Sequence, residues 1–213
     1  EGGYYYFFNV LEELDIPGEY YIDRDDGILY FYPPDENENS KILLSTSNEN
    51  IISITEKASN ITIGGLTLQG TRNDALMVAG ENCKIVNCAI KNAAECGINV
   101  SGKNNLVENC EVTFIGKDAV MLSGGSEEGF IYGNNTVTNN SLHDYGEIQK
   151  TYIAGVNISG IGNTVSHNEI YNAPHMGIYY MGNENVMEYN YIHDVVLQSS
   201  DAGAIYTGYS YST

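Results

Sequence analysis

The sequence is poor in several residue types that would point to other classes of protein. It contains no Trp, only four Pro, and nine basic residues against 28 acidic ones, which gives a formal charge of −19. This charge disfavours nucleic acid and anionic membrane surfaces as partners, because both would repel the chain and no Lys/Arg cluster is present to neutralise them. No apolar run reaches the ~18 residues of a membrane-spanning helix, so we expect no membrane insertion. A neutral glycan or a bound cation remains compatible with the charge.

Cysteine is scarce, and its spacing is not that of a metal or redox motif. No two of the cysteines form a C-x-x-C pair, so we interpret them as buried free thiols. The chain also has no initiator Met and no signal peptide, which favours a processed product or a fragment. The four cysteines are Cys83, Cys88, Cys96 and Cys110.

Gly, Asn, Tyr, Ile, Val and Thr are abundant by contrast, a composition typical of strands joined by tight turns. The same apolar pattern returns about every 22 residues, and about six copies can be aligned. In later copies, which contain insertions, Asn140, Asn168 and Asn190 occupy the position that Cys88 and Cys110 hold earlier. The ungapped copies align Ile63 with Ile85 and Val107, Leu66 with Cys88 and Cys110, Leu68 with Ile90 and Val112, Leu76 with Ile98 and Val120, and Val78 with Val100 and Leu122.

Within each copy, apolar residues alternate at period two in short runs separated by Gly and Asn. Each copy is therefore predicted to form about three short strands and three turns, and to rise by one strand spacing of ~4.8 Å. The fold class that we predict is all-β: a right-handed parallel β-helix of about six rungs. Equivalent residues would stack on one another, and the stacked Asn side chains would bond along the column as a ladder.

The first 40 residues lie outside the repeat. Asp25-Asp26-Gly27 separates two runs of alternating aromatic and aliphatic residues, which predicts a β-hairpin. We therefore divide the chain into an N-terminal hairpin-containing segment at 1–40 and a β-helix domain at 41–213.

The repeat resembles the β-helices of pectate lyase-like proteins, in which the turn with the Asn ladder is tight and the other two turns accept insertions. Here the insertions are Gly125–Gly133, Tyr145–Ala154 and Val195–Ser200. They flank the strand that begins Gly-Ile on both sides. This strand is thus predicted to form the floor of a groove that suits an extended polysaccharide.

Three motifs resemble large bacterial β-helix proteins, some of which are classed with glycoside hydrolase family 141. The motifs lie at 11–34, at 172–175 and at 188–208, where the last contains Asp201-Ala202-Gly203-Ala204-Ile205-Tyr206-Thr207-Gly208. The resemblance implies a secreted, cell-surface or periplasmic bacterial enzyme that processes glycans, with Asp201 as a catalytic carboxylate. Tyr209 stands where the family usually has Arg, and a further Asp-containing motif is expected beyond Thr213, so we expect the β-helix to be truncated at its C-terminal end.

Four residues are candidate catalytic groups, since glycosidic cleavage needs two carboxyl groups about 5 to 9.5 Å apart. His175 aligns one rung from Asp201, although Asp201 also suits the cap of a turn. Asp144 and Asp194 align two rungs apart, ~10 Å between backbones, with Asn172 between them. Asn and Asp after a short strand are often turn formers, which is the alternative for this column.

Candidate substrate-binding residues lie on the outward side of the predicted groove strand and beside the acidic column. Tyr rings offer stacking faces to sugars, although Tyr is also common in sheets. His143 and His193 could bind a metal ion, but two rungs separate them, so we predict no metal site for them. The acidic loop Ser126-Glu127-Glu128 could bind Ca²⁺ or simply be solvated. We expect no other cofactor. The substrate-binding candidates are Tyr179, Tyr206, Asn157, Asn99, His143 and His193.

These observations predict a secreted glycoside hydrolase that acts on a polysaccharide. A non-catalytic glycan-binding or adhesive module is an alternative from another class, because the fold alone does not define the function. A polysaccharide lyase or epimerase is a third, but that chemistry requires basic residues to neutralise a uronate carboxylate, and the sequence has few. The sequence leaves the oligomeric state open.

Overall fold

The computed structural model describes residues 7–34 and 42–208. The chain divides into two compact units, Glu1–Leu43 and Leu44–Thr213. The first contains a short 3-10 helix and the predicted antiparallel hairpin, whose turn is closed by Asp23 Oδ1 accepting the backbone N–H groups of Asp25 and Asp26. Its elements are η1 (Leu11–Glu13), β1 (Tyr20–Asp23) and β2 (Ile28–Phe31).

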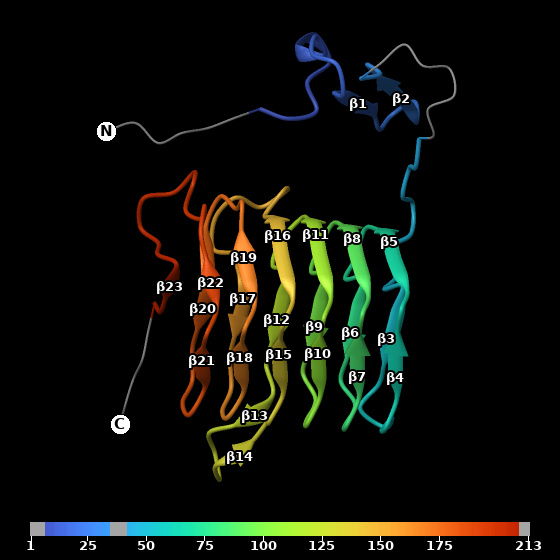
Figure 1. Cartoon of the computed structure of the whole chain (residues 1–213). Helices are drawn as coiled ribbons and strands as arrows, with labels where there is room; N and C mark the ends of the chain where they lie inside the picture. The colour runs from blue at the N-terminus through green and yellow to red at the C-terminus, as the bar shows by residue number, and fades with distance from the viewer. Residues whose placement is uncertain (1–6, 35–41, 209–213) are drawn as a thin grey trace. The chain divides into compact units, whose positions relative to one another are not determined.

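The second unit is a right-handed parallel β-helix, as predicted, in which three parallel sheets line three sides of a continuous coil (Figure 1). Each rung contributes one strand to each sheet in turn. Sheet 1 contains β4 (Thr62–Gly64), β7 (Lys84–Val86), β10 (Leu106–Glu108), β15 (Thr136–Thr138), β18 (Thr164–Ser166) and β21 (Val186–Glu188). Sheet 2 contains β5 (Thr67–Thr71), β8 (Ala89–Ala93), β11 (Glu111–Ile115), β16 (Ser141–Tyr145), β19 (Glu169–Tyr171) and β22 (Tyr191–Ile192). Sheet 3 contains β3 (Ile52–Ile54), β6 (Leu76–Val78), β9 (Ile98–Val100), β12 (Val120–Leu122), β17 (Ala154–Ile158), β20 (Met176–Tyr180) and β23 (Ile205–Tyr206).

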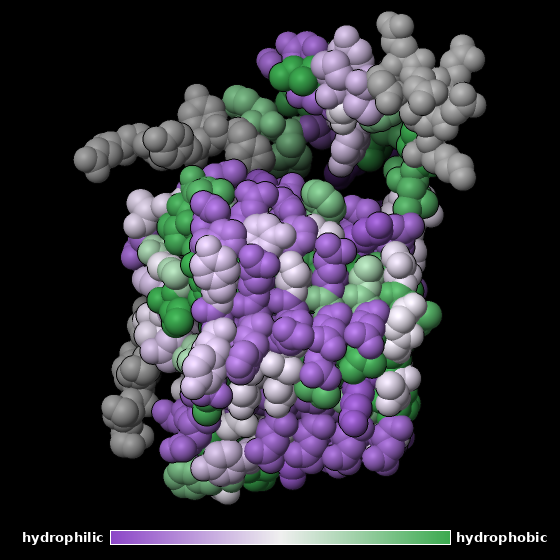
Figure 2. Space-filling model, in the orientation of Figure 1, coloured by the Kyte–Doolittle hydropathy of each residue, from purple (hydrophilic) through white to green (hydrophobic). Residues whose placement is uncertain are grey.

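The strand register confirms the repeat alignment. Ile63 pairs with Ile85, and Ile85 pairs with Val107, so residues one repeat apart are neighbours on successive rungs. Most of the aligned apolar side chains are buried inside the coil, while Figure 2 shows a largely hydrophilic outer face. Leu66 aligns with the buried Cys88 and Cys110 but is itself 46% exposed. It lies on the first complete rung, where no earlier copy of this turn covers it.

The predicted Asn ladder is present at the corner between sheets 1 and 2. Asn168 Oδ1 accepts from the backbone N–H and the side-chain amide of Asn140, and Asn190 Oδ1 accepts from the same two groups of Asn168. Asn140 Oδ1 accepts the backbone N–H of Cys110, so the thiol column continues the ladder. All four cysteines are free and buried, and burial raises the pKa of Cys110 to about 11.

A second Asn ladder, which the repeat alignment missed, follows the corner between sheets 3 and 1. Each Asn accepts the backbone N–H of its predecessor through Oδ1, and its amide nitrogen donates to a glycine carbonyl of an earlier turn. A long insertion after β12 breaks the spacing of this column in the sequence, which hid it. Its members are Asn105, Asn135, Asn163 and Asn185.

Small residues form the corner between sheets 2 and 3 because the backbones of adjacent rungs approach closely there. A Cβ on Gly177 would lie 2.5 Å from Ile192 Cγ2 and 2.6 Å from the carbonyl oxygen of Ala204. This contact explains the Gly-Ile motif that begins the sheet 3 strand. Residues 7–34 and 42–208 contain no helix of the length and apolarity that a membrane crossing requires.

Candidate functional site

A row of half-buried side chains runs along the outward face of sheet 3, one from each rung. Asn99, Met121 and Asn157 are register partners on successive rungs, and Tyr179 and Tyr206 continue the row. Met77 precedes Asn99 in the same register. The four groove candidates of the sequence analysis therefore share one face, where amide, thioether and aromatic groups follow one another along the β-helix axis. We call this row the floor.

The insertions border the floor on both sides, as the repeat alignment predicted. On the side of sheet 2, the insertion within Tyr145–Ala154 docks on the preceding turn, where Glu147 N–H donates to the Ile115 carbonyl at 3.0 Å. The insertion at Val195–Ser200 docks in the same way, since Val196 N–H donates to the His175 carbonyl at 2.8 Å. Both insertions therefore lie at the edge of sheet 3 that is next to sheet 2.

On the opposite side, the insertion forms an antiparallel hairpin of β13 (Gly125–Ser126) and β14 (Ile131–Tyr132). A hollow of about 300 Å³ lies beside this hairpin, lined by Tyr132, Lys103 and Glu81 among others. It shares no lining residue with the floor or with Asp201. Floor and hollow are thus separate features of the surface.

Asp201 lies at the C-terminal end of the floor. The Tyr206 hydroxyl donates to Asp201 Oδ1 at 3.1 Å, and this hydrogen bond raises the pKa of Tyr206. The register of the last rung pairs Ile178 with Ile205 and Tyr179 with Tyr206, one residue away from the alignment that set Asp201 beside His175. The His175 and Pro174 carbonyls instead accept from the backbone N–H groups of Val196 and Gln198.

His175 is buried beside this end of the floor. Its ring centroid lies 6.0 Å from that of the exposed Tyr152, and its Nδ1 is buried without a hydrogen-bond partner among the described residues. Burial lowers the pKa of His175, while the Ile153 backbone and the charge of Asp201 oppose this shift. Burial therefore favours the neutral imidazole of His175, and the charge of Asp201 acts on this ring.

Two aspartates beneath the floor were missed by sequence reasoning. Asp118 is only 5% exposed, and its Oδ1 accepts from the Ala154 N–H at 2.7 Å and from Asn157 Nδ2 at 3.4 Å. Asp74 repeats the arrangement two rungs earlier, accepting from the Cys96 N–H at 2.9 Å and from Asn99 Nδ2 at 3.1 Å. The two aspartates are two repeats apart, and this spacing was visible in the sequence. Each Asn partner lies on the following rung, too far along the sequence for the pairing to be recognised.

Burial raises the pKa of Asp118 to about 6, against the opposing hydrogen bonds from Ala154 and Asn157. Burial likewise raises the pKa of the neighbouring Cys96 thiol, and the charges of Asp118 and Asp74 add to the effect. Buried carboxylates whose pKa is raised toward neutral pH are common in functional sites.

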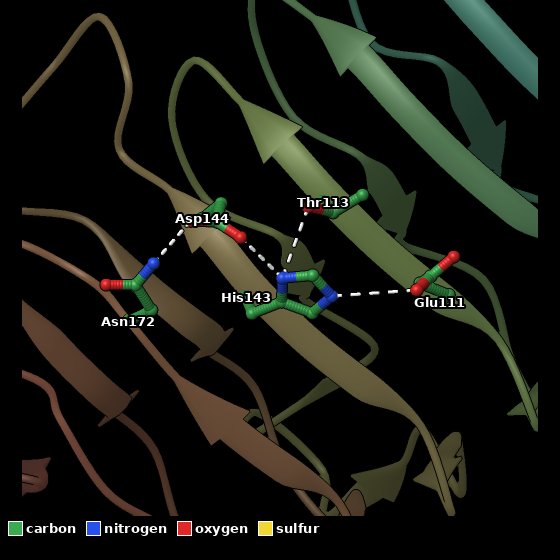
Figure 3. Close-up of polar contacts among 5 residues, drawn as sticks. All are labelled: Glu111, Thr113, His143, Asp144 and Asn172. Carbon is green, nitrogen blue, oxygen red and sulfur yellow. Dashed lines mark hydrogen bonds and ion pairs between the residues drawn. The ribbon is translucent and has the colours of Figure 1, made fainter.

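The other candidate residues lie together on the outward face of sheet 2, away from the floor. His143, Tyr171 and His193 stack on successive rungs, with ring centroids 4.6 Å and 5.0 Å apart. Figure 3 shows the first part of this cluster, in which His143 Nδ1 lies 2.6 Å from Asp144 Oδ2 and Nε2 faces Glu111 at 3.7 Å. His193 repeats the arrangement with Asp194 at 2.8 Å and Glu169 at 3.4 Å.

Asp144 and Asp194 belong to a column in which the backbone is left-handed. Their φ angles are 50° and 47°, and Asn172 between them has φ 51°. Asn and Asp tolerate this conformation better than most residues, which gives the column a structural reason. The Asn172 amide nitrogen also donates to Asp144 Oδ1 at 2.5 Å, so an amide stands between the two carboxylates. A catalytic role for Asp144 and Asp194 stays a prediction.

The charged loops near the floor are mostly paired. Lys117 forms an ion pair with Glu95, and Lys150 lies 4.0 Å from Glu147. In the acidic loop, Glu127 Oε1 accepts from the Asn183 amide at 3.0 Å. No cluster of three or more His, Cys, Asp or Glu side chains able to hold a metal ion occurs in the part of the chain that the structure describes.

Comparison with known proteins identifies the architecture. The family model described as "Right handed beta helix region" matches residues 50–213. Among solved structures, the enzymatically active domain of tailspike protein 2 from bacteriophage CBA120 aligns at 10% identity and a TM-score of 0.44, covering 74% of this chain and 36% of that one. The A-module of the mannuronan C-5 epimerase AlgE4 from Azotobacter vinelandii aligns at 13% identity and a TM-score of 0.39, covering 71% and 58% of the two chains. No curated protein sequence matches the chain.

Proposed function

Since the chain belongs to the family of right handed beta helix regions, we propose that it is a carbohydrate-active protein that holds an extended glycan along the floor of sheet 3. Within that class we propose a glycoside hydrolase, the activity that the resemblance to glycoside hydrolase family 141 implies. The polymeric substrate favours a location outside the cytoplasm, at the cell surface or in the surrounding medium.

One observation carries the proposal: a straight row of amide and aromatic side chains is bordered on both sides by insertions and ends at a carboxylate. Asn99 and Asn157 offer hydrogen-bonding amides, and Tyr179 and Tyr206 offer ring faces and hydroxyl groups. Rungs are ~4.8 Å apart, so the row presents one contact per strand spacing to a ligand that lies along the axis. A linear polymer is the shape of ligand that such a row fits.

Asp201 is the group that we propose to act on the glycosidic bond. It is exposed at the end of the floor, and the Tyr206 hydroxyl that donates to Oδ1 fixes its orientation. His175 is held neutral by burial and lies in the adjacent wall, where it can accept or donate a proton. Glycoside hydrolysis needs a second group that transfers a proton, and we propose His175 for this role. Asp118 is too distant to serve, since the register places it three rungs from Asp201, ~14 Å away.

Two alternatives remain open to experiment. A non-catalytic glycan-binding module needs only the floor and its walls. A lyase or epimerase is less well supported, because Lys117 and Lys150 in the walls are both engaged with glutamates and would have to leave them to neutralise a uronate.

The test is to incubate the chain with a panel of plant and mucin glycans and to measure released reducing ends, binding and unsaturated products. Asp201→Asn is expected to abolish release while leaving binding within about threefold of the unmodified chain, because the floor is unchanged. Glu188→Gln, which removes one exposed charge on β21, is the control and should leave both unchanged.

Release that survives in Asp201→Asn would remove Asp201 from the reaction. Binding without turnover in every protein would favour the adhesive module. Products with an unsaturated uronic end would identify a lyase, and an absence of binding to any glycan would overturn the proposed function itself.

A further inference from the structure

The floor contains a repeated device, in which a carboxylate beneath the surface holds an outward Asn of the next rung. Asp74 holds Asn99, and Asp118 holds Asn157. The two copies lie two rungs apart. Met77 lies on the rung before Asn99, and Met121 lies on the rung between Asn99 and Asn157. We call each copy an Asp–Asn pair.

The hydrogen-bonding chemistry of the pair fixes which way the amide faces. An ionised carboxylate only accepts hydrogen bonds, so the Asn side chain must turn its nitrogen toward the Asp and its carbonyl oxygen away from it. The same Asp is itself held, since a backbone N–H of the next rung donates to each, at 2.9 Å from Cys96 and 2.7 Å from Ala154. Neither amide can flip without leaving its Asp with an unfavourable oxygen-to-oxygen contact.

We propose that the Asp–Asn pairs make the floor selective for uncharged glycans over polyuronates, an inference that rests on the proposed function. The Oδ1 atoms of Asn99 and Asn157 are then fixed acceptors, two rungs or ~10 Å apart, which match the hydroxyl donors of a neutral sugar chain. A uronate carboxylate is an acceptor only, so it gains nothing from these oxygens.

Charge acts in the same direction. Each pair places a negative carboxylate within hydrogen-bond distance of its Asn, and the whole chain carries a formal charge of −19. The lysines of the walls, Lys117 and Lys150, are engaged with Glu95 and Glu147. A polyanion would meet repulsion from below the floor, whereas the thioethers of Met77 and Met121 offer apolar contact to the carbon face of a neutral sugar.

The two oxygens of Asp74 support a positioning role over a purely structural one. Asp74 accepts the Cys96 N–H through Oδ1 and Asn99 Nδ2 through Oδ2. An Asn in its place has one carbonyl oxygen for these two donors, so its own Nδ2 would face one of them. The carboxylate is therefore needed to hold the Asn99 nitrogen inward, whereas at Asp118 the single oxygen Oδ1 accepts from both Ala154 and Asn157.

The experiment compares binding of a neutral polysaccharide, such as xylan, with binding of polygalacturonate by calorimetry. The unmodified chain is expected to bind the neutral polymer at least tenfold more tightly. In Asp74→Asn the carbonyl oxygen stays with the Cys96 N–H, and the introduced amide nitrogen makes Asn99 turn its oxygen inward and its N–H groups outward. The preference should therefore fall by about tenfold, the equivalent of one good hydrogen bond.

Two further variants separate orientation from charge and from folding. Glu188→Gln removes the same single charge from β21 and should leave the preference unchanged. Asp118→Asn acts on the other Asp–Asn pair, where one carbonyl oxygen can still accept from both Ala154 and Asn157, so it should reduce the preference less than Asp74→Asn. A thermal melt of Asp74→Asn should show no loss of stability, whereas a merely structural Asp74 would lower the melting temperature.

The outcomes distinguish this inference from the proposed function. Equal or tighter binding of polygalacturonate by the unmodified chain would overturn the selectivity and leave a glycan-binding function in place. A preference that survives in Asp74→Asn, or that falls equally in Glu188→Gln, would overturn the role of the pair. Binding to no polysaccharide at all would remove the proposed function and this inference with it.

Discussion

The corners and the floor of this β-helix use the same residue in opposite ways. At the corner between sheets 1 and 2, Asn140 and Asn168 are almost fully buried, and both ends of each amide are bonded to neighbouring rungs. On the floor, Asn99 and Asn157 are half-buried and bonded at the nitrogen end to an aspartate. The corner amides use their hydrogen bonds for the fold, whereas the floor amides keep an oriented carbonyl group for a ligand.

The difference shows how a repeat can separate architecture from function. A corner amide bonds to the equivalent residues of the neighbouring rungs, so it recurs on consecutive rungs and appears as a column in the sequence. A floor amide needs an aspartate on the preceding rung, and the floor alternates between Asn and Met. Stability should therefore depend on the corners, and selectivity on the floor.

The largest expected effect comes from removing a corner amide. Asn168→Ala leaves the Asn140 backbone N–H and side-chain amide without their acceptor inside the core, at a cost of about 3 kcal/mol or more in the free energy of unfolding. Asn157→Ala on the floor should cost less than about 1 kcal/mol, since its amide is half-buried. Urea unfolding of the two variants measures both values, and equal losses would contradict the division between corner and floor.

An intermediate effect is expected from the pH dependence of Asp118. Its pKa rises on folding from 3.8 to about 6, so the folded state binds more protons than the unfolded state between these values. Stability should therefore fall as the pH rises through this window, by up to about 3 kcal/mol from this group, and stay lower above it. Asp118→Asn should remove that loss and be more stable than the unmodified chain at pH 7, but not at pH 3.

Urea unfolding at a series of pH values checks this prediction. Other carboxylates also titrate in this range, so the difference between the two proteins is the quantity to follow. An unchanged pH profile in Asp118→Asn would show that burial does not raise the pKa of this group.

The smallest effect concerns His175 and His193, which lie in different environments. The hydrogen bond to Asp194 raises the pKa of the half-buried His193, whereas burial lowers the pKa of His175. His193 should therefore lose its proton at higher pH than His175, and Asp194→Asn should lower the pKa of His193. Proton NMR titration of the ring signals measures both, and the reverse order would contradict the assigned environments.

Much of the fold could be predicted because the repeat is carried by side chains whose position does not depend on distant partners. Ile85 and Val107 are buried wherever the rung is placed, and the hairpin at 20–31 follows from its Asp-Asp-Gly turn. The second Asn ladder escaped because the insertion at Gly125–Gly133 breaks its spacing. The exposure of Leu66 could not be seen in its column, because burial of a rung depends on the rung before it.

The candidate site was less predictable, for a related reason. The outward position of Asn99, Asn157 and Tyr179 follows from alternation along a strand, so the row could be found from the sequence. The importance of Asp118 depends on its partner Asn157, 39 residues later in the chain, and on burial that only the coil creates. The side chain of Asp201 could not be placed to one residue, because the insertion before it leaves the register of the last rung free.

The most direct measurement of the central claim is NMR of the Asn side-chain amides during titration with a neutral polysaccharide fragment. Binding along the floor predicts shifts of the Asn99 and Asn157 signals, with the Asn140 and Asn168 signals unmoved inside the corner. Shifts confined to the corner amides, or to side chains on sheets 1 and 2 with Asn99 and Asn157 unaffected, would contradict it.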